Sequence, residues 1–278
     1  MPWVQVGDIR LCYQTAGQGP PLLFIPGSGG DLRARPGVFD WPLVRHFQVL
    51  SYDQRGLGRS DKPPGPYSMA QYADDAAGLL EAVGWPQALV VGYSFGGMVA
   101  QELALRHPGR VRRLVLISTT AGGAGGSSYP LHELADLSLP ARARRLAQLS
   151  DLRRHLAWQQ AHPTRFEELC RQWLADLSLG ADEPGRAQGL RWQLEARRHH
   201  DTWDRLPSLN VPTLVCAGRH DGIAPRQAQE ALARRIPGAR LAWFDGGHRF
   251  FLRDPTAWPT IVAFLQARGQ GAESPSLG

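Results

Sequence analysis

The chain has 278 residues, a formal net charge of +6 at pH 7 and a hydrophobic fraction of 43%. This length and composition suit one large globular domain with an insertion, and no apolar run approaches the length of a membrane span. The first residues lack a basic segment followed by an apolar one, so we expect no signal peptide and a cytoplasmic location.

The positive charge comes almost entirely from arginine, because Lys62 is the only lysine among the 31 basic residues. The arginines are scattered, and no nucleic-acid-binding motif accompanies them, so we predict a solvated basic surface and no nucleic-acid or membrane partner. The cysteines Cys12, Cys170 and Cys216 are odd in number and far apart. This spacing excludes a disulfide framework and a cysteine metal site, and we interpret each cysteine as a small core residue. We also expect no metal elsewhere in the chain.

Short apolar runs alternate with helical patterns through most of the chain. The predicted strands are 3–6, 9–13, 22–25, 47–52, 89–91, 114–117, 214–217 and 241–244. Apolar residues at helical spacing predict helices within 72–83, 98–104, 227–236 and 256–267. This alternation predicts an α/β fold with a mostly parallel central sheet that helices cover on both faces.

The alternation stops between residues 119 and 207, where the strand patterns disappear. Two amphipathic helices are predicted there, one marked by Leu146, Leu149, Leu152 and Leu156, the other by Phe166, Leu169, Trp173 and Leu177. We predict a core domain of residues 1–118 and 208–268, a helical cap of residues 119–207, and a disordered tail of residues 269–278.

Ligands bind at the carboxyl ends of the strands in open α/β sheets, and a cap inserted after a strand should cover that edge. We therefore expect the cap to shape the substrate pocket and to contribute no triad member and no oxyanion donor. Trp158 and Trp173 are the candidate substrate-binding residues.

The most informative motif is Gly92-Tyr93-Ser94-Phe95-Gly96, which follows an apolar strand and precedes a helical stretch. A turn this sharp leaves no room for side chains two residues before and after its apex, which explains both glycines. The pattern is typical of a nucleophile elbow, which projects the serine hydroxyl above the sheet at a helix N-terminus. A glycine-rich turn with a surface serine is the alternative interpretation.

A serine hydroxyl needs a base to take its proton and a carboxylate to orient that base. Of the nine histidines, His248 follows the last predicted strand in a glycine-flanked loop and is the predicted base. His220 also follows a strand, but the neighbouring Asp221 fits the position of the acid better. Asp245 is interpreted as a loop residue, because it would have to fold back to reach His248.

The charge that develops on the attacked carbonyl oxygen needs two backbone N–H donors, an oxyanion hole. One is predicted from Phe95, the residue after the nucleophile. The other is expected from the glycine-rich loop that follows the strand at 22–25, where Ser28 is the candidate.

Two further segments, together with the elbow motif, make this sequence similar to a known family. The segment Asp53-Gln54-Arg55-Gly56-Leu57-Gly58-Arg59-Ser60 and the triplet Gly246-Gly247-His248, together with the elbow, resemble the α/β-hydrolase fold family over residues 3–267. The resemblance implies a cofactor-free serine hydrolase of the carboxylesterase type that acts on a small or medium apolar ester. Lactonases, thioesterases and C–C bond hydrolases use the same triad, and a non-catalytic ligand receptor on this fold is a further alternative. The sequence leaves the oligomeric state open.

Two positions depart from the family pattern. The first loop usually contains His-Gly, whereas this chain has Pro26-Gly27, so the hydrogen bonds that support the loop must differ. Tyr93 precedes the nucleophile where many members have His or Asn. Ser94 itself argues against the haloalkane dehalogenases and epoxide hydrolases of similar fold, which use Asp at this position.

Overall fold

The computed structural model describes residues 1–267, and the tail predicted for residues 269–278 lies outside the described residues. The strands are β1 (Trp3–Val6), β2 (Ile9–Ala16), β3 (Pro21–Ile25), β4 (Gln48–Tyr52), β5 (Ala88–Tyr93), β6 (Val111–Ile117), β7 (Thr213–Gly218) and β8 (Arg240–Phe244). They form one eight-stranded sheet in the order β1-β2-β4-β3-β5-β6-β7-β8. The pairs β1–β2 and β2–β4 are antiparallel and the other pairs are parallel, so the predicted mostly parallel sheet is confirmed.

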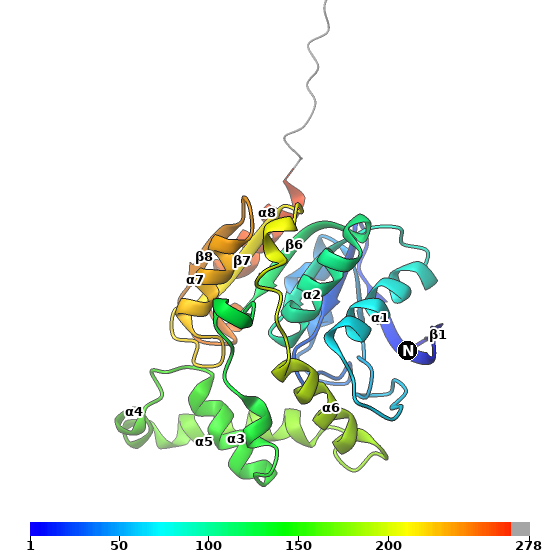
Figure 1. Cartoon of the computed structure of the whole chain (residues 1–278). Helices are drawn as coiled ribbons and strands as arrows, with labels where there is room; N and C mark the ends of the chain where they lie inside the picture. Colours follow the sequence, from blue (N-terminus) through cyan, green and yellow to red (C-terminus); the bar gives the residue numbers. More distant parts are fainter. Residues whose placement is uncertain (268–278) are drawn as a thin grey trace, which may run out of the picture.

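The sheet is buried on both faces, as the continuous apolar runs of its strands predict. In β3, Leu22 and Phe24 belong to one hydrophobic core, while Leu23 and Ile25 belong to the other, because successive side chains of a strand point to opposite faces. The helices α1 (Met69–Ala82), α2 (Phe95–Arg106) and α7 (Arg226–Arg235) pack on one face, and α8 (Ala257–Gln266) packs on the other. Figure 1 shows the sheet between these two layers.

Between β6 and β7 the described chain forms helices and no named strand. The helices are α3 (Leu139–Leu149), α4 (Leu156–Ala161), α5 (Pro163–Ser178) and α6 (Arg186–Arg198). In Figure 1 they gather below the sheet, at one end of the molecule. Residues 119–207, the predicted cap, are called the insertion below.

One predicted helix of the insertion is too long. Leu152 and Leu156 continue the apolar spacing of α3, but the helix ends at Leu149, and these two side chains are 58% and 68% exposed. The chain leaves the helix because the Leu152 N–H donates to the carbonyl of His220 at 2.8 Å, outside the insertion. The Asp151 carboxylate also accepts from the Arg153 N–H, which favours a turn at this point.

The two ends of the insertion meet at one narrow place. An isolated antiparallel bridge pairs Gly122 with Asp201, and the Thr202 N–H donates to the carbonyl of Ala121 at 2.9 Å. A Cβ atom at Gly122 would overlap the carbonyl oxygen of His200, so this contact requires glycine. The insertion therefore leaves and rejoins the core through a packed, hydrogen-bonded junction.

His200 at this junction makes stability depend on pH. Its side chain is buried, and burial lowers the pKa of His200 to about 3. In the unfolded chain a histidine titrates near its ordinary pKa of about 6.5. Between these values the unfolded chain binds a proton that the folded chain excludes, so the free energy of unfolding falls as pH decreases. The limiting slope for one proton is about 1.4 kcal/mol per pH unit.

We therefore expect His200→Gln to lose less stability than the wild type between pH 7 and pH 4.5, by about 2 kcal/mol, measured by urea unfolding. His46→Gln is the matched control, because His46 is exposed and should leave the wild-type pH dependence unchanged. Equal losses of stability in the wild type and His200→Gln would contradict the expectation.

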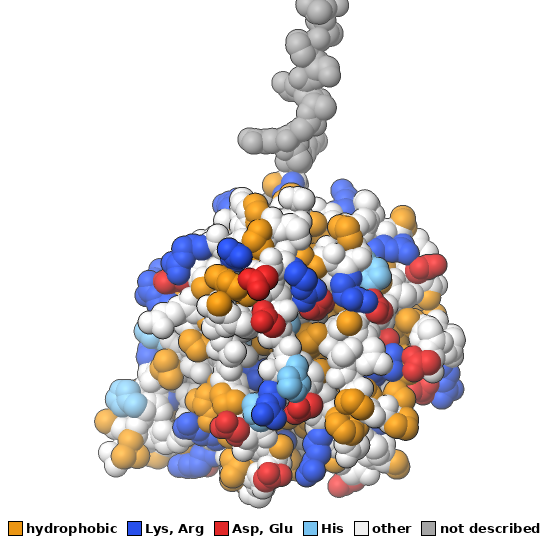
Figure 2. Space-filling view, viewed as in Figure 1, with side chains coloured by type: hydrophobic (Ala, Val, Ile, Leu, Met, Phe, Trp, Pro, Cys, Tyr) orange, Lys and Arg blue, Asp and Glu red, His pale blue; other side chains and the backbone are white. Residues whose placement is uncertain are grey.

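The surface mixes charges of both signs. On the face shown in Figure 2, Lys and Arg side chains are interspersed with Asp and Glu side chains. Many arginines are paired, for example Arg106 with Asp74 at 2.9 Å and Arg226 with Glu230 at 2.9 Å. This face therefore offers no continuous basic surface of the kind that binds nucleic acid.

Candidate active site

Strand β5 leads into helix α2 through a sharp turn with Ser94 at its apex. Ser94 has φ 54° and ψ −115°, which non-glycine residues rarely adopt. A Cβ atom at Gly92 would overlap the backbone of Gly96, and one at Gly96 would overlap the carbonyl of Ile25 in β3. Glycine is therefore required at both positions, and the turn places Ser94 at the carboxyl end of β5.

Three side chains from distant parts of the chain form a hydrogen-bonded series. The Oγ atom of Ser94 lies 2.9 Å from Nε2 of His248, and Nδ1 of His248 lies 2.9 Å from Oδ2 of Asp221. Because the carboxylate only accepts, we assign the proton to Nδ1, which leaves Nε2 free to accept from the serine hydroxyl. This is the arrangement in which an imidazole can remove a serine proton.

The carboxylate of this series is held rigidly. Its Oδ1 atom accepts from the N–H groups of Ile223 and Ala224 at 2.8 and 2.9 Å, while Oδ2 faces the imidazole. Asp221 and His248 are each 3% exposed, so bulk water competes little for their hydrogen bond. A buried carboxylate with this partner stabilises an imidazolium when one forms.

The insertion holds the loops that carry both residues. The backbone N–H of His248 donates to the carbonyl of Ser150 at 2.7 Å, and the N–H of Gly222 donates to the carbonyl of Leu149 at 3.0 Å. Ser150 and Leu149 are at the end of α3. The insertion provides no member of the Ser94–His248–Asp221 series, but its backbone holds the two loops that carry His248 and Asp221.

The competing histidine lies outside the series. His220 is partly exposed, and its Nε2 atom is 3.8 Å from Oδ1 of Asp245, which is itself largely exposed. The Asp245 carboxylate also pairs with Arg153 at 3.0 Å. Asp245 therefore has surface partners and does not approach His248.

The two predicted oxyanion donors lie on two segments that meet at Ser94. Ser28 lies in the loop after β3, and Phe95 is the first residue of α2. Among the described residues, neither of their backbone N–H groups has a hydrogen-bond partner. A Cβ atom built at Gly27 would lie 3.4 Å from Cβ of Ser94, so the loop contacts the apex of the elbow. Two free N–H groups beside a serine are suited to a developing oxyanion.

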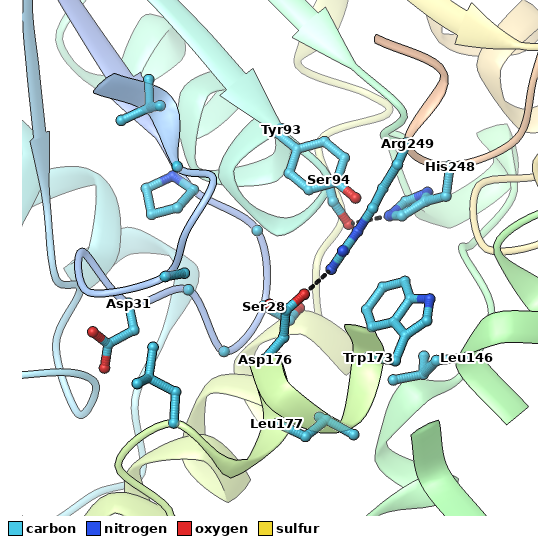
Figure 3. A pocket seen from close by; sticks show the side chains of 18 of the residues that line it. Ser28, Asp31, Tyr93, Ser94, Leu146, Trp173, Asp176, Leu177, His248 and Arg249 are labelled. Atoms are coloured by element: carbon cyan, nitrogen blue, oxygen red, sulfur yellow. Dashed lines mark hydrogen bonds and ion pairs between the residues drawn. The ribbon is translucent and has the colours of Figure 1, made fainter. Parts of the chain in front are cut away.

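A cavity of about 240 Å³ opens at Ser94 between the core and the insertion. Ser28 and His248 line it from the core, and Leu146, Trp173 and Leu177 line it from the insertion. Figure 3 shows these side chains around the space in front of Ser94. The cavity therefore combines polar groups at one wall with apolar groups at another, as small-molecule sites do.

The two tryptophans predicted to contact substrate lie in different places. Trp173 lines the cavity. Trp158 is not among the lining residues, and its ring stacks on His162 with centroids 4.8 Å apart and packs against the cluster around Phe166. Trp158 therefore serves the packing of the insertion, because α4 places it against the cluster around Phe166 and not on the cavity wall, and we no longer assign it to the substrate.

Sequence reasoning missed a charged pair inside the cavity. Nη2 of Arg249 donates to Oδ2 of Asp176 at 2.8 Å, and the Arg249 guanidinium lies 3.7 Å from the centre of the Trp173 ring. In Figure 3 this pair crosses the space in front of Ser94. The sequence carried one signal for Arg249, since this residue directly follows the predicted base His248. The pair joins the core to α5 and narrows the cavity.

Tyr93, the unusual residue before the nucleophile, forms part of the floor. Its ring lies 5.2 Å from the His248 ring and 5.0 Å from the Phe251 ring. Burial raises the pKa of the Tyr93 hydroxyl, so the phenol stays neutral. Tyr93 therefore supports the imidazole by packing.

Residues 1–267 contain no cluster of three or more His, Cys, Asp or Glu side chains placed to hold a metal ion. No helix in this part of the chain is both long enough and apolar enough to cross a membrane.

Comparison with known proteins identifies the family of the chain. The profile of a family described as alpha/beta hydrolase fold matches residues 20–255. The 2-hydroxymuconate semialdehyde hydrolase of Pseudomonas putida is 35% identical over 242 residues, which cover 84% of this chain and 82% of that protein. The poly(3-hydroxyalkanoate) depolymerase of Ectopseudomonas oleovorans is 31% identical over 267 residues, covering 91% of this chain and 86% of that protein.

Solved structures show the same similarity. The crystal structure of the enol-lactonase from Burkholderia xenovorans LB400 matches with a TM-score of 0.77 and 28% identity, covering 96% of this chain and all of that one. The chain belongs to the α/β-hydrolase fold family. The relatives named here are hydrolytic enzymes by name, and we take this chain to be a hydrolase of the same family.

Proposed function

We propose that the protein is a serine hydrolase that cleaves a carboxylic ester of a small or medium apolar substrate through an acyl-enzyme intermediate. The observation that carries the proposal is the hydrogen-bonded series Ser94–His248–Asp221, which opens on a cavity. Beside Ser94, the backbone N–H groups of Ser28 and Phe95 have no hydrogen-bond partner among the described residues. A serine in this setting has a base to remove its proton and donors to receive the resulting oxyanion.

The reaction proceeds in two halves. Ser94 Oγ attacks the ester carbonyl while His248 Nε2 takes the hydroxyl proton, and the oxyanion accepts hydrogen bonds from the N–H groups of Ser28 and Phe95. The carbonyl re-forms, the bond to the alcohol oxygen breaks, and His248 gives its proton to that oxygen. Water then attacks the acyl-enzyme with His248 as base, which releases the acid and restores Ser94. Asp221 stabilises the imidazolium in both halves.

The apolar wall formed by Leu146, Trp173 and Leu177 supports an acyl or aryl group as the part of the substrate bound by the insertion. The names of the relatives span a semialdehyde, a polyester and an enol-lactone. The same serine and base serve lactones, thioesters and C–C bonds, so these substrates are the alternatives within the proposal.

An activity screen tests the proposal. The assay measures kcat/KM on p-nitrophenyl esters of graded chain length, several lactones and thioesters, and a C–C cleavage substrate, with Ser94→Ala as the blank. We expect Ser94-dependent hydrolysis of at least one carboxylic ester. Turnover confined to another substrate class would replace the ester assignment, and no turnover together with no reaction with a fluorophosphonate would indicate a ligand receptor.

The position of Trp173 predicts a change in chain-length preference. We expect Trp173→Ala to shift the ratio of kcat/KM between long and short acyl esters by about tenfold or more, because hydrophobic discrimination amounts to about 1–3 kcal/mol per methylene-sized change. The rate on an acetate ester should fall by less than about tenfold.

Trp158→Ala is the matched control, because it removes the same side chain from the insertion outside the cavity. It should lower the thermal midpoint and leave the ratio of rates unchanged. The assignment of Trp173 fails if both variants lower stability and neither changes the ratio.

A further inference from the structure

Helix α6 of the insertion is hydrogen-bonded directly to the loop that carries Ser28. We call residues 26–30 the oxyanion loop. Within this loop, the N–H of Gly29 donates to Oε1 of Gln193 at 2.8 Å, and the carbonyl of Gly29 accepts from Nη2 of Arg186 at 3.2 Å. Both polar groups of the residue next to Ser28 are therefore bound by the insertion.

The conformation of the loop shows why these two bonds matter. The Gly30 N–H donates to the carbonyl of Gly27 at 3.1 Å, and Gly29 has φ +72°, as the third residue of a type II turn requires. Ser28 is the second residue of this turn, so its own N–H is free to face the cavity. The N–H that Gln193 accepts belongs to the peptide bond between Ser28 and Gly29. This hydrogen bond therefore fixes the orientation of the peptide group next to the Ser28 N–H, the predicted oxyanion donor.

The two residues of α6 are well placed to hold the loop. Gln193 is fully buried and Arg186 is 4% exposed. They are seven residues apart, which puts them two helical turns apart on one face. Between them, a Cβ atom at Gly189 would overlap the carbonyl of Gly56, so α6 packs directly on the core backbone. The hydrogen bonds to Gly29 thus come from a firmly seated helix.

Pro26, which stands where the family usually has histidine, makes the hydrogen bonds from α6 more important for the oxyanion loop. Proline has no N–H and no polar side-chain atom, so it cannot provide the hydrogen bonds that histidine could at this position. On the core side, Nε2 of Gln54 donates to the carbonyl of Pro26 at 2.8 Å. The bonds from α6 supply the support at the other end of the loop.

We propose that Gln193, together with Arg186, is a positioning residue for the oxyanion loop, so that helix α6 of the insertion determines the rate of the chemical step. The proposal rests on the proposed function, because the loop acts only if Ser28 contributes its N–H to an oxyanion. Without the Gln193 acceptor, the Gly29 N–H would have no partner in its present conformation. The loop would then shift, and the Ser28 donor would move away from the position of the oxyanion.

The test compares Gln193→Met with Gln188→Met, which makes the same substitution at an exposed position of α6. We expect Gln193→Met to lower kcat by about ten- to a hundredfold and to change KM by less than about threefold. The inhibition constant of a trifluoromethyl ketone, whose adduct with Ser94 carries an oxyanion, should rise in parallel with the loss of kcat/KM. Gln188→Met should match the wild type in all three quantities.

Arg186→Met is the second variant, and Arg186→Lys should recover part of the activity because it keeps a donor. If Gln193→Met does not fold, these two variants carry the test. Each rate is divided by the concentration of active sites, which is titrated with a fluorophosphonate, so unfolded protein does not lower kcat. If Gln193 has a purely structural role, its substitution lowers the thermal midpoint and leaves kcat unchanged. Folded Gln193→Met or Arg186→Met with wild-type kcat and inhibition constant would overturn the proposal.

The outcome also separates this proposal from the proposed function. If the wild type hydrolyses no ester but reacts with the fluorophosphonate, the ester assignment fails, and the rate of that reaction in each variant tests the role of Gln193. If the wild type does neither, both proposals fail. If the wild type hydrolyses esters and the variants do so equally, the role of Gln193 alone is wrong.

Discussion

Ser94→Ala is expected to lower kcat by about 10⁴- to 10⁶-fold while the fold remains intact. The substitution removes one hydroxyl, which is hydrogen-bonded to Nε2 of His248 at 2.9 Å. Alanine has the same Cβ atom as serine, so the strained backbone at φ 54° costs about the same in both. The loss therefore reports the nucleophile and not a change of structure.

The measurement is kcat on the best ester from the screen, with circular dichroism and the thermal midpoint as checks of folding. Ser208→Ala, at an exposed serine that ends the short helix Leu206–Ser208 before β7, is the control and should keep wild-type activity. If purified Ser94→Ala keeps a tenth or more of the wild-type rate, another residue is the nucleophile.

His248→Gln is expected to lower kcat by about 10⁴-fold or more, because no base then removes the serine proton. His220→Gln should change kcat by less than about twofold, since its imidazole is partly exposed and lies beside Asp245. The two variants make the same substitution in the two histidines that follow strands at the carboxyl edge of the sheet.

Kinetic measurements on both variants decide between the two bases. We expect the kcat of His220→Gln to lie within about twofold of the wild-type kcat, and the kcat of His248→Gln to lie far below both. An active His248→Gln together with an inactive His220→Gln would reverse the assignment of the base.

The sequence predicts the positions of the Ser94, Asp221 and His248 groups because each follows a strand of a parallel sheet. The carboxyl ends of such strands meet at one edge, so chain order and strand ends are enough to bring these residues together. The elbow adds a local steric requirement, which the glycines at 92 and 96 make visible in the sequence.

The contacts between the insertion and the core were beyond sequence reasoning. The bond from His248 to Ser150 and the bond from Gly29 to Gln193 join residues about a hundred or more positions apart. The first bond joins two backbone groups and the second involves the buried side-chain amide of Gln193, and neither kind of bond produces a periodic pattern in the sequence. Arginine at position 186 likewise resembles the other arginines of the chain until the fold places it on Gly29.

The insertion also shows the limits of periodicity. Apolar spacing predicts that a helix has a buried face, but it does not tell which neighbour that face contacts. Trp158 and Trp173 were equivalent by this criterion, yet only Trp173 lines the cavity. Leu152 and Leu156 continued the spacing of α3 beyond its end, because a hydrogen bond to His220 takes the chain out of the helix.

The most direct test of the account is covalent labelling with a fluorophosphonate followed by peptide mapping on the wild-type protein. The account predicts one phosphonyl group per chain, located on Ser94, and slow labelling in His248→Gln because the base is absent. Absence of labelling, or labelling at a different serine with Ser94 unmodified, would contradict the assignment of Ser94 as the nucleophile.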